Sequence, residues 1–168
     1  MLDIDETQSA NPELYKAYLI TIIKNNIRSL TKACALLIKN KDNMSLNDTE
    51  SNQLKALLES HVNNEHDLET IWLLYLLIEV ERITANDSLI QIIVDDENEL
   101  AQIILLRKQL LSNSNLELIC GKAKSWILLY ELYIGNFIDE DAFISKLNLS
   151  KNVDFYRNLK RRNLHLVC

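Results

Sequence analysis

The chain has 168 residues, of which 31 are Leu, 19 are Ile, two are Gly and one is Pro, and its formal net charge is −6. So few glycines exclude a G-x-G-x-x-G dinucleotide loop and a G-x-x-x-x-G-K phosphate loop, because both motifs need glycine where the backbone approaches phosphate. The apolar fraction of 48% and the charged fraction of 25% are typical of a folded globular protein.

Helical periodicity extends over most of the chain, and its first half contains four predicted helices. The first begins after Asn11-Pro12, and the second spans residues 27–38. The third runs from about Asp48 to Val62, and the fourth from about Asp67 to Arg82. The apolar face of the first helix is expected to contain Leu14, Tyr18, Ile22 and Ile23. The centre of the fourth, residues 71–78, is apolar on every side, which predicts burial in the middle of a bundle or stack.

The second half contains five further predicted helices. The first two run from a cap at Asn86 or Asp87 to Val94, and from a cap at Asp95 and Asp96 to about Leu111. The next two run from about Leu116 to Tyr133, and from a cap cluster at Asp139-Glu140-Asp141 to Leu147. The last runs from about Val153 to His165. Residues 112–115 are expected to form a loop, and Gly135-Asn136 to end the long helix. Alternation with period two never persists, so no strand is predicted. The predicted fold is therefore all-α: a HEAT-like stack of about eight or nine antiparallel helices, in a single domain over residues 1–168.

One segment of the chain recurs in similar form about 54–55 residues later. Ile71-Trp72-Leu73-Leu74-Tyr75 recurs as Ser125-Trp126-Ile127-Leu128-Leu129-Tyr130, with one extra residue between Trp and Tyr. Such self-similarity is typical of stacked helical repeats, and the expected repeats are residues 67–120 and 121–168. The alternative is coincidence in a chain rich in Leu and Ile.

The charge is unevenly distributed. Residues 151–168 contain five Lys or Arg residues and one Asp, a net charge of +4, which leaves −10 for the rest of the chain. An acidic body argues against nucleic acid wrapping around the whole protein, although it allows a local contact through the basic end.

Nothing in the sequence predicts export or membrane insertion. The N-terminus is acidic and lacks the basic and apolar regions of a signal peptide. The longest apolar run, residues 71–78, is far shorter than the ~20 residues of a membrane span. The cysteines, Cys34, Cys120 and Cys168, form no C-x-x-C motif, which favours reduced thiols, with Cys34 and Cys120 in the core. We therefore expect a soluble, cytoplasmic protein that has no contact with a membrane.

Two patterns that suggest metal chemistry have simpler interpretations. His61 and His66 are five residues apart across a predicted break, a spacing that does not place two ligands on one helix face. Polymerase palms hold two divalent metals with the paired carboxylates of an aromatic-x-Asp-Asp motif. In Val94-Asp95-Asp96 the Asp pair lies between two helical patterns and is better explained as a helix cap. We therefore predict no catalytic, cofactor-binding or metal-binding residues.

The aromatic pairs Trp72/Tyr75 and Trp126/Tyr130 have helical spacing, which favours core packing. A base-stacking platform would need exposed rings flanked by cations, a condition that Lys122 and Lys124 meet in part beside Trp126.

The strongest candidate for a binding surface is the basic cluster, which we define as Arg157, Lys160, Arg161 and Arg162. On a helix, Arg157, Lys160 and Arg161 share one face, where they could contact phosphate oxygens or an acidic partner. The alternative is a solvated face whose cations suit the C-terminal end of the helix dipole.

Residues 65–160 resemble the helical C-terminal region of bacterial defence-associated reverse transcriptases, the abortive-infection and retron-like enzymes. The resemblance rests on the motifs Glu69-x-x-Trp72-Leu-Leu-Tyr75, Ser125-Trp126-Ile-Leu-Leu-Tyr130-Glu131-Leu, Phe143-x-x-x-Leu147 and Val153-Asp-Phe155-Tyr156. It implies an accessory domain that packs against the polymerase, shapes its nucleic-acid channel or mediates assembly. The polymerase fingers and palm are absent, so no catalytic residue of the family carries over.

We therefore expect a non-catalytic helical-repeat accessory domain of an RNA-directed DNA polymerase in phage defence. Its expected partners are the polymerase domain or another protein, and nucleic acid through the basic cluster. The alternative is a free-standing helical adaptor or regulator without a polymerase connection. An all-α enzyme is disfavoured, because the apolar helix centres leave little room for a polar pocket.

Overall fold

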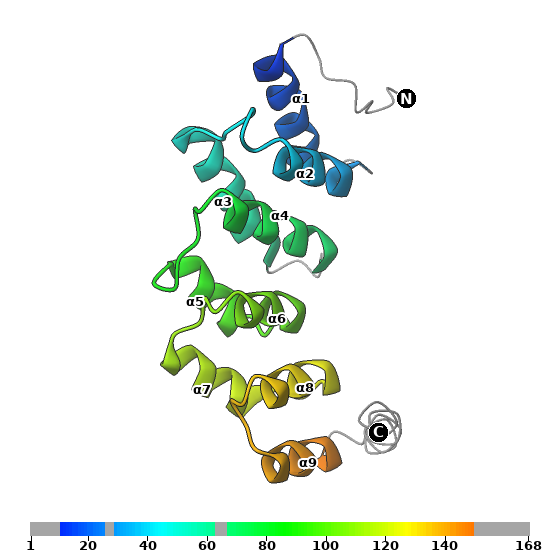
Figure 1. The fold of residues 1–168 in the computed structure, drawn as a ribbon, viewed down its shortest axis with the longest axis vertical. Coiled ribbons are helices and arrows are strands. Elements are labelled where there is room, and N and C mark those ends of the chain that lie inside the picture. The colour runs from blue at the N-terminus through cyan, green and yellow to red at the C-terminus, as the bar shows by residue number, and fades with distance from the viewer. Residues whose placement is uncertain (1–10, 26–28, 63–66, 150–168) are drawn as a thin grey trace, which may run out of the picture. The chain divides into compact units, whose positions relative to one another are not determined.

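The structure is a computed structural model that describes residues 11–25, 29–62 and 67–149 (Figure 1). Within these ranges it contains nine α-helices and no strand, which confirms the all-α class. The chain divides into two compact units, residues 1–104 (unit 1) and residues 105–168 (unit 2). The HEAT-like arrangement, the single domain and the repeats at residues 67–120 and 121–168 stay predictions.

The helices of unit 1 are α1 Pro12–Lys24, α2 Leu30–Lys39, α3 Asp48–Val62, α4 Asp67–Glu79 and α5 Ser88–Asp95. Helix α6, Glu99–Arg107, crosses the division, and α7 Asn113–Lys122, α8 Trp126–Ile134 and α9 Glu140–Leu149 lie in unit 2. None of the helices in the described ranges is long and apolar enough to cross a bilayer.

Side-chain caps explain where several helices begin. The Oδ1 atom of Asn11 accepts hydrogen bonds from the backbone N–H groups of Glu13 (3.1 Å) and Leu14 (3.2 Å), and Pro12 occupies the first helical position of α1. Asp87 caps α5 in the same way through the N–H of Leu89, at 2.9 Å. Asp139 caps α9, because its Oδ1 accepts from the N–H of Ala142 at 2.7 Å. The predicted caps at Asp87 and Asp139 are thus confirmed.

Three helices end in the same way although the chain is poor in glycine. After α4, α6 and α8, a backbone N–H bonds to the carbonyl five residues earlier: Arg82 to Leu77, Leu110 to Leu105 and Phe137 to Leu132. This is the Schellman ending, and it requires a residue with positive φ just before the donor. That residue is Glu81 after α4 (φ 57°), Gln109 after α6 (φ 57°) and Asn136 after α8 (φ 60°). The ending recurs every 27–28 residues, half of the sequence period.

We expect Gln109→Gly to raise the free energy of unfolding of unit 2 by about 0.5–1 kcal/mol, because glycine adopts positive φ without steric cost. Gln109 is exposed, so the substitution removes no packing. The control is Gln91→Gly inside α5, where the same substitution should cost about 1 kcal/mol. Urea unfolding monitored by tryptophan fluorescence measures both, with Trp72→Phe or Trp126→Phe leaving one tryptophan in the unit under study. Destabilisation by Gln109→Gly would contradict this interpretation of the helix end.

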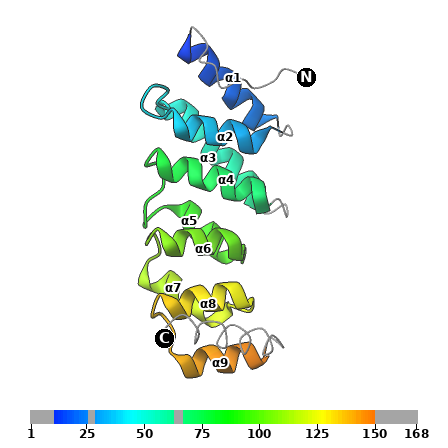
Figure 2. The ribbon, with the colours of Figure 1, turned by 45° about the vertical axis from the view of Figure 1, so that its right-hand side comes forward.

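The core of unit 1 forms around α4. Its residues Leu73, Leu74, Leu76 and Leu77 are completely buried, and the helix packs against both α2 and α3. Figure 2 shows α2 and α4 side by side. The predicted burial of residues 71–78 is therefore confirmed for the leucines, whereas the remaining side chains, including Trp72, are half-buried.

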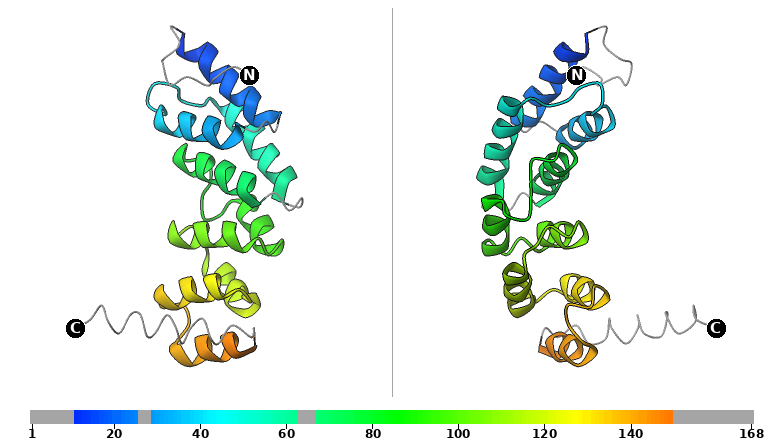
Figure 3. Two further views of the ribbon diagram at one scale, coloured as in Figure 1. Left: turned by 90° about the vertical axis from the view of Figure 1, so that its right-hand side faces the viewer. Right: turned by 60° about the vertical axis from the view of Figure 1, so that its left-hand side comes forward.

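The core of unit 2 lies between α8 and α9, which pack side by side (Figure 3). Leu128, Leu129 and Leu132 of α8 are buried. Phe143 of α9 is also buried, and its ring stacks on that of Tyr133 with a centroid distance of 4.9 Å and an interplanar angle of 5°. Trp126, at the first position of α8, is half-buried.

The predicted long helix from Leu116 to Tyr133 is wrong. The chain forms α7 and α8, with an extended residue, Ala123, after α7 and a new cap at Ser125, whose Oγ accepts from the N–H of Leu128 at 3.3 Å. The predicted loop over residues 112–115 is wrong for a similar reason, since Ser112 caps α7 through the N–H of Asn115. Apolar periodicity continues through the break between α7 and α8, whereas residues 112–115 are polar. In both places a serine side chain caps the helix that follows.

The predicted cap at Asp95 and Asp96 is also wrong. Asp95 is the last residue of α5 and Asp96 follows it as the C-terminal cap. Asn98 caps α6 instead, since its Oδ1 accepts from the N–H of Ala101 at 3.0 Å. Glu97 has a φ of 56°, which turns the chain between the two helices and leaves only Asn98 at the capping position.

The predicted apolar face of α1 is partly wrong. Ile22 and Ile23 are buried, but Leu14 is 69% exposed and Tyr18 37% exposed. The core-facing side contains Lys16, Leu19, Ile20 and Ile23 instead. Helix α1 is apolar over more than one face, so periodicity alone allows two orientations, and contacts with α2 and α3 select between them.

Candidate functional site

The basic cluster lies outside the residues that the structure describes, and so does the predicted helix from Val153 to His165. The phosphate-binding surface therefore stays a prediction.

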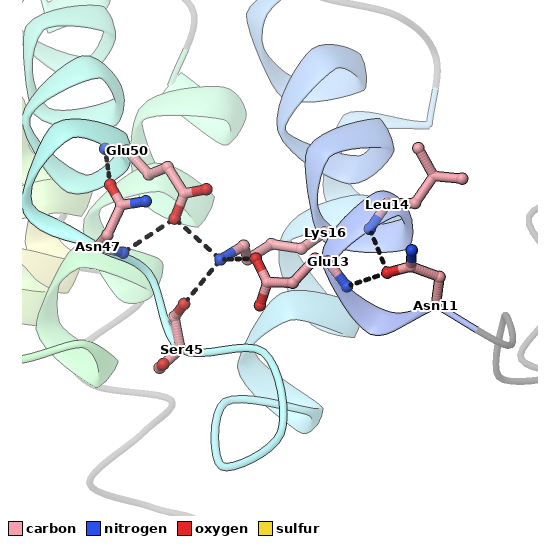
Figure 4. Close-up of polar contacts among 7 residues, drawn as sticks. All are labelled: Asn11, Glu13, Leu14, Lys16, Ser45, Asn47 and Glu50. Atoms are coloured by element: carbon pink, nitrogen blue, oxygen red, sulfur yellow. Dashed lines mark hydrogen bonds and ion pairs between the residues drawn. The ribbon is translucent and has the colours of Figure 1, made fainter.

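Among the described residues of unit 1, the most enclosed charge is Lys16 on α1, which sequence reasoning missed. It is 4% exposed, and its Nζ lies 2.8 Å from Oε2 of Glu13 and 3.2 Å from Oε2 of Glu50. Nζ also donates a hydrogen bond to the carbonyl of Ser45 at 3.1 Å. Figure 4 shows how these contacts join α1 to the loop before α3 and to the first turn of α3.

Glu50 is held in place by a reciprocal capping box at the start of α3. Its N–H donates to Oδ1 of Asn47, and the N–H of Asn47 donates to Oε2 of Glu50, both at 2.9 Å (Figure 4). The same carboxylate oxygen therefore caps α3 and binds Lys16. The Asn-x-x-Glu spacing is visible in the sequence, but the partner from α1 is not.

Electrostatics make Lys16 a structural cation. Burial favours a lower pKa, but the hydrogen bonds and charges of Glu13 and Glu50 outweigh it and raise the pKa of Lys16. A nucleophilic or basic lysine needs a lowered pKa. The geometry of this cluster therefore suits a brace between helices and not an amine that reacts.

Unit 2 contains a comparable ion pair between Arg107 at the end of α6 and Glu131 in α8. The Nε of Arg107 donates to Oε2 of Glu131 at 3.0 Å, and Nη2 donates to Oε1. Glu131 is 8% exposed, so the two-point contact compensates a carboxylate that has little access to water. Its partner is 24 residues away in the chain, and no local pattern predicts the pair.

The histidines and tryptophans that the sequence suggested for metal or base binding lie in different surroundings. Within the described ranges, no group of three or more His, Cys, Asp or Glu side chains is placed to hold a metal ion. His61 is half-buried on α3, and His66 lies outside the described residues. Trp72 and Trp126 are half-buried, and Trp72 packs near Tyr75 with a centroid distance of 6.4 Å.

The two described cysteines differ in their surroundings. Cys34 is completely buried in α2, which confirms its prediction as a core residue, and burial raises the pKa of its thiol to about 12. Cys120 is only half-buried. Burial raises the pKa of Cys120 as well, and the positive charge of Lys146 opposes that rise. A raised pKa keeps both sulfurs protonated at neutral pH and disfavours nucleophilic chemistry.

We expect the free energy of unfolding of unit 1 to fall above pH 9, by about 1 kcal/mol per pH unit, because of Cys34. Its thiol ionises near 9.0 in the unfolded chain and at about 12 in the folded one. The unfolded state therefore loses its proton first, and stability is lost as the pH rises through this window. Urea unfolding at pH 8–11 should show a steeper decline for the wild type than for Cys34→Ala. Equal slopes would contradict the expectation.

Large apolar side chains are exposed on several helices and in the loop after α8. In unit 1 they are Leu14, Tyr18, Leu68 and Leu100, and in unit 2 they are Ile127, Ile134 and Phe137. Isolated exposed residues are normal, whereas neighbours on one helix face indicate a contact surface. Leu14 and Tyr18 are such neighbours, four residues apart on α1.

Comparisons with known proteins provide no further assignment: the chain matches no protein-family model, no curated protein and no solved structure.

Proposed function

We propose that this protein is a non-catalytic helical-repeat module that acts by binding another macromolecule. One observation supports this proposal most directly: the most enclosed charges described above, Lys16 and Glu131, each form an ion pair that joins two helices. Buried charged groups paired in this way stabilise the packing of the helices. Large apolar side chains meanwhile remain exposed on outer faces, as expected of a protein that works through its surface.

The finer proposal is an accessory domain of a reverse transcriptase in phage defence. It rests on the resemblance of residues 65–160 to the helical C-terminal region of those enzymes. The partners would be the polymerase domain and, through the basic cluster, its template or product strand. A net charge of +4 over residues 151–168 of an acidic chain supports a local phosphate contact.

The test is binding of a fluorescein-labelled 20-nucleotide single strand, as DNA and as RNA, by the full chain as salt is varied. If all four cations contact phosphates, affinity for a single strand should fall roughly 50-fold between 50 and 200 mM salt. Replacing Arg157, Lys160, Arg161 and Arg162 with Gln should weaken binding and flatten the salt dependence.

The matched control removes the same charge elsewhere, by replacing the exposed Lys32, Lys39, Lys41 and Lys108 with Gln. It should leave binding and its salt dependence nearly unchanged. If the wild type does not bind, or if both variants behave alike, the proposed nucleic-acid contact is wrong.

The alternative function is a free-standing adaptor that binds only protein, which the exposed apolar side chains favour. The two proposals differ in gene context. A polymerase reading frame that continues upstream of Met1 would favour the reverse-transcriptase connection. A separate gene whose product binds no strand in the salt titration would favour the adaptor.

A further inference from the structure

The outer face of α1 is an uncharged stripe of four exposed residues: Leu14, Ala17, Tyr18 and Thr21. They are spaced i, i+3, i+4 and i+7, the spacing of a surface that packs against another helix. The hydroxyl of Thr21 donates to the carbonyl of Ala17 at 2.8 Å, so this polar group is already satisfied within the helix. Leu14 is 69% exposed, so most of its apolar surface is open to contact.

The charges beside this stripe are arranged so that two copies of α1 could form ion pairs with each other. Glu13 lies at the start of α1 and Lys24 at its end, and their helical angles place both on the same side of the stripe. In two antiparallel helices, the same flank of each helix meets the other. Glu13 of one copy would therefore lie beside Lys24 of the second copy, and the contact would occur twice by symmetry.

Both side chains have capacity for this second contact. Glu13 is 70% exposed and binds Lys16 through one oxygen, which leaves the other oxygen as an acceptor. Lys24 donates to Gln53, and an ammonium group has two further donors. Antiparallel helices also align their dipoles favourably.

We infer that two copies of this chain associate through an antiparallel pairing of their α1 helices, with the two-fold axis near Ala17 and Tyr18. Ala17 allows the two helices to approach closely, and Leu14 of one copy packs near Thr21 of the other. A single pair of 13-residue helices buries less area than the roughly 1,600 Å² of a standard stable interface. The dimer is therefore weak, and its dissociation constant lies in the micromolar range.

Sedimentation velocity of the full chain from 5 to 500 µM tests the association. We expect a shift from monomer to dimer over this range, and Tyr18→Glu should weaken dimerisation at least tenfold. Ala17→Glu serves as a second variant, because a small exposed residue tolerates substitution without loss of folding. Leu68→Glu is the control: it adds the same charge at an exposed leucine of α4 and should leave dimerisation unchanged.

Cysteine cross-linking tests the antiparallel geometry, in a background with Cys120→Ser and Cys168→Ser. Residues 17 of the two copies lie side by side near the axis, so Ala17→Cys should form a disulfide-linked dimer under a mild oxidant. Residues 24 lie about 20 Å apart along the helices, so Lys24→Cys should not. A chain that stays monomeric at every concentration, as it would if other residues of the same chain or a different partner cover the stripe, overturns the inference. Cross-linking of Lys24→Cys as efficient as that of Ala17→Cys also overturns it.

Discussion

Replacing Lys16 with Ala is expected to lower the free energy of unfolding of unit 1 by about 3 kcal/mol. The substitution removes two ion pairs and the hydrogen bond to the Ser45 carbonyl. It also leaves Glu50, whose side chain is 19% exposed, without its cation. Loss of the packed aliphatic stem adds to the effect, because Lys16 is itself buried in the contact between α1 and its neighbours.

Two variants separate the causes of this loss. Lys16→Met keeps most of the stem and removes the charge, so it should recover part of the stability but not all of it. Lys41→Ala is the matched control: it removes a lysine that pairs with Glu79 at 3.1 Å but is 46% exposed, and it should cost less than 1 kcal/mol.

Urea unfolding monitored by Trp72 fluorescence in a Trp126→Phe background reports on unit 1 alone. Equal losses of unfolding free energy for Lys16→Ala and Lys41→Ala would show that the contacts of Lys16 do not stabilise the packing of α1 on α3. Alkaline pH should act in the same direction as the substitution. The pKa of Lys16 is raised in the folded state, so its contribution is complete below the ordinary value of 10.5 and is lost as the pH rises through the folded pKa.

Leu74→Ala is expected to destabilise unit 1 by about 2–5 kcal/mol. Leu74 is completely buried in the part of α4 that packs between α2 and α3, and truncation leaves a cavity that close-packed neighbours fill only in part. Its control is Leu68→Ala on the same helix, which truncates a leucine that is 61% exposed and should cost less than 1 kcal/mol. The same tryptophan background measures both variants. A loss below 1 kcal/mol for Leu74→Ala would mean that α4 is not the centre of this core.

The sequence predicted the parts of the fold that depend on local signals. The bounds of α3 agree with the structure at Asp48 and Val62, and the caps at Asp87 and Asp139 were correct, because an apolar pattern and a capping side chain coincide there. The prediction failed where the apolar pattern continued through a break, as between α7 and α8. It also failed where tertiary contacts choose between two apolar faces, as on α1.

The charged contacts were beyond sequence reasoning for a different reason. Lys16 meets Glu50 across 34 residues of chain, and Arg107 meets Glu131 across 24. Pairs at such separations depend on how helices pack, and nothing in a single sequence specifies them. The uncharged stripe on α1 was partly visible as Leu14 and Tyr18, but its outward direction emerged only from the fold.

Both units are helical bodies built on the buried leucines of α4 and α8. Residue-level amide hydrogen exchange tests this claim most directly. Within unit 1, the slowest amides should be those of residues 73–77, and within unit 2 those of residues 128–132, each exchanging only through unfolding of its whole unit. If these amides exchange as fast as those of the exposed first turn of α1, the two apolar segments do not form the cores, and the claim fails.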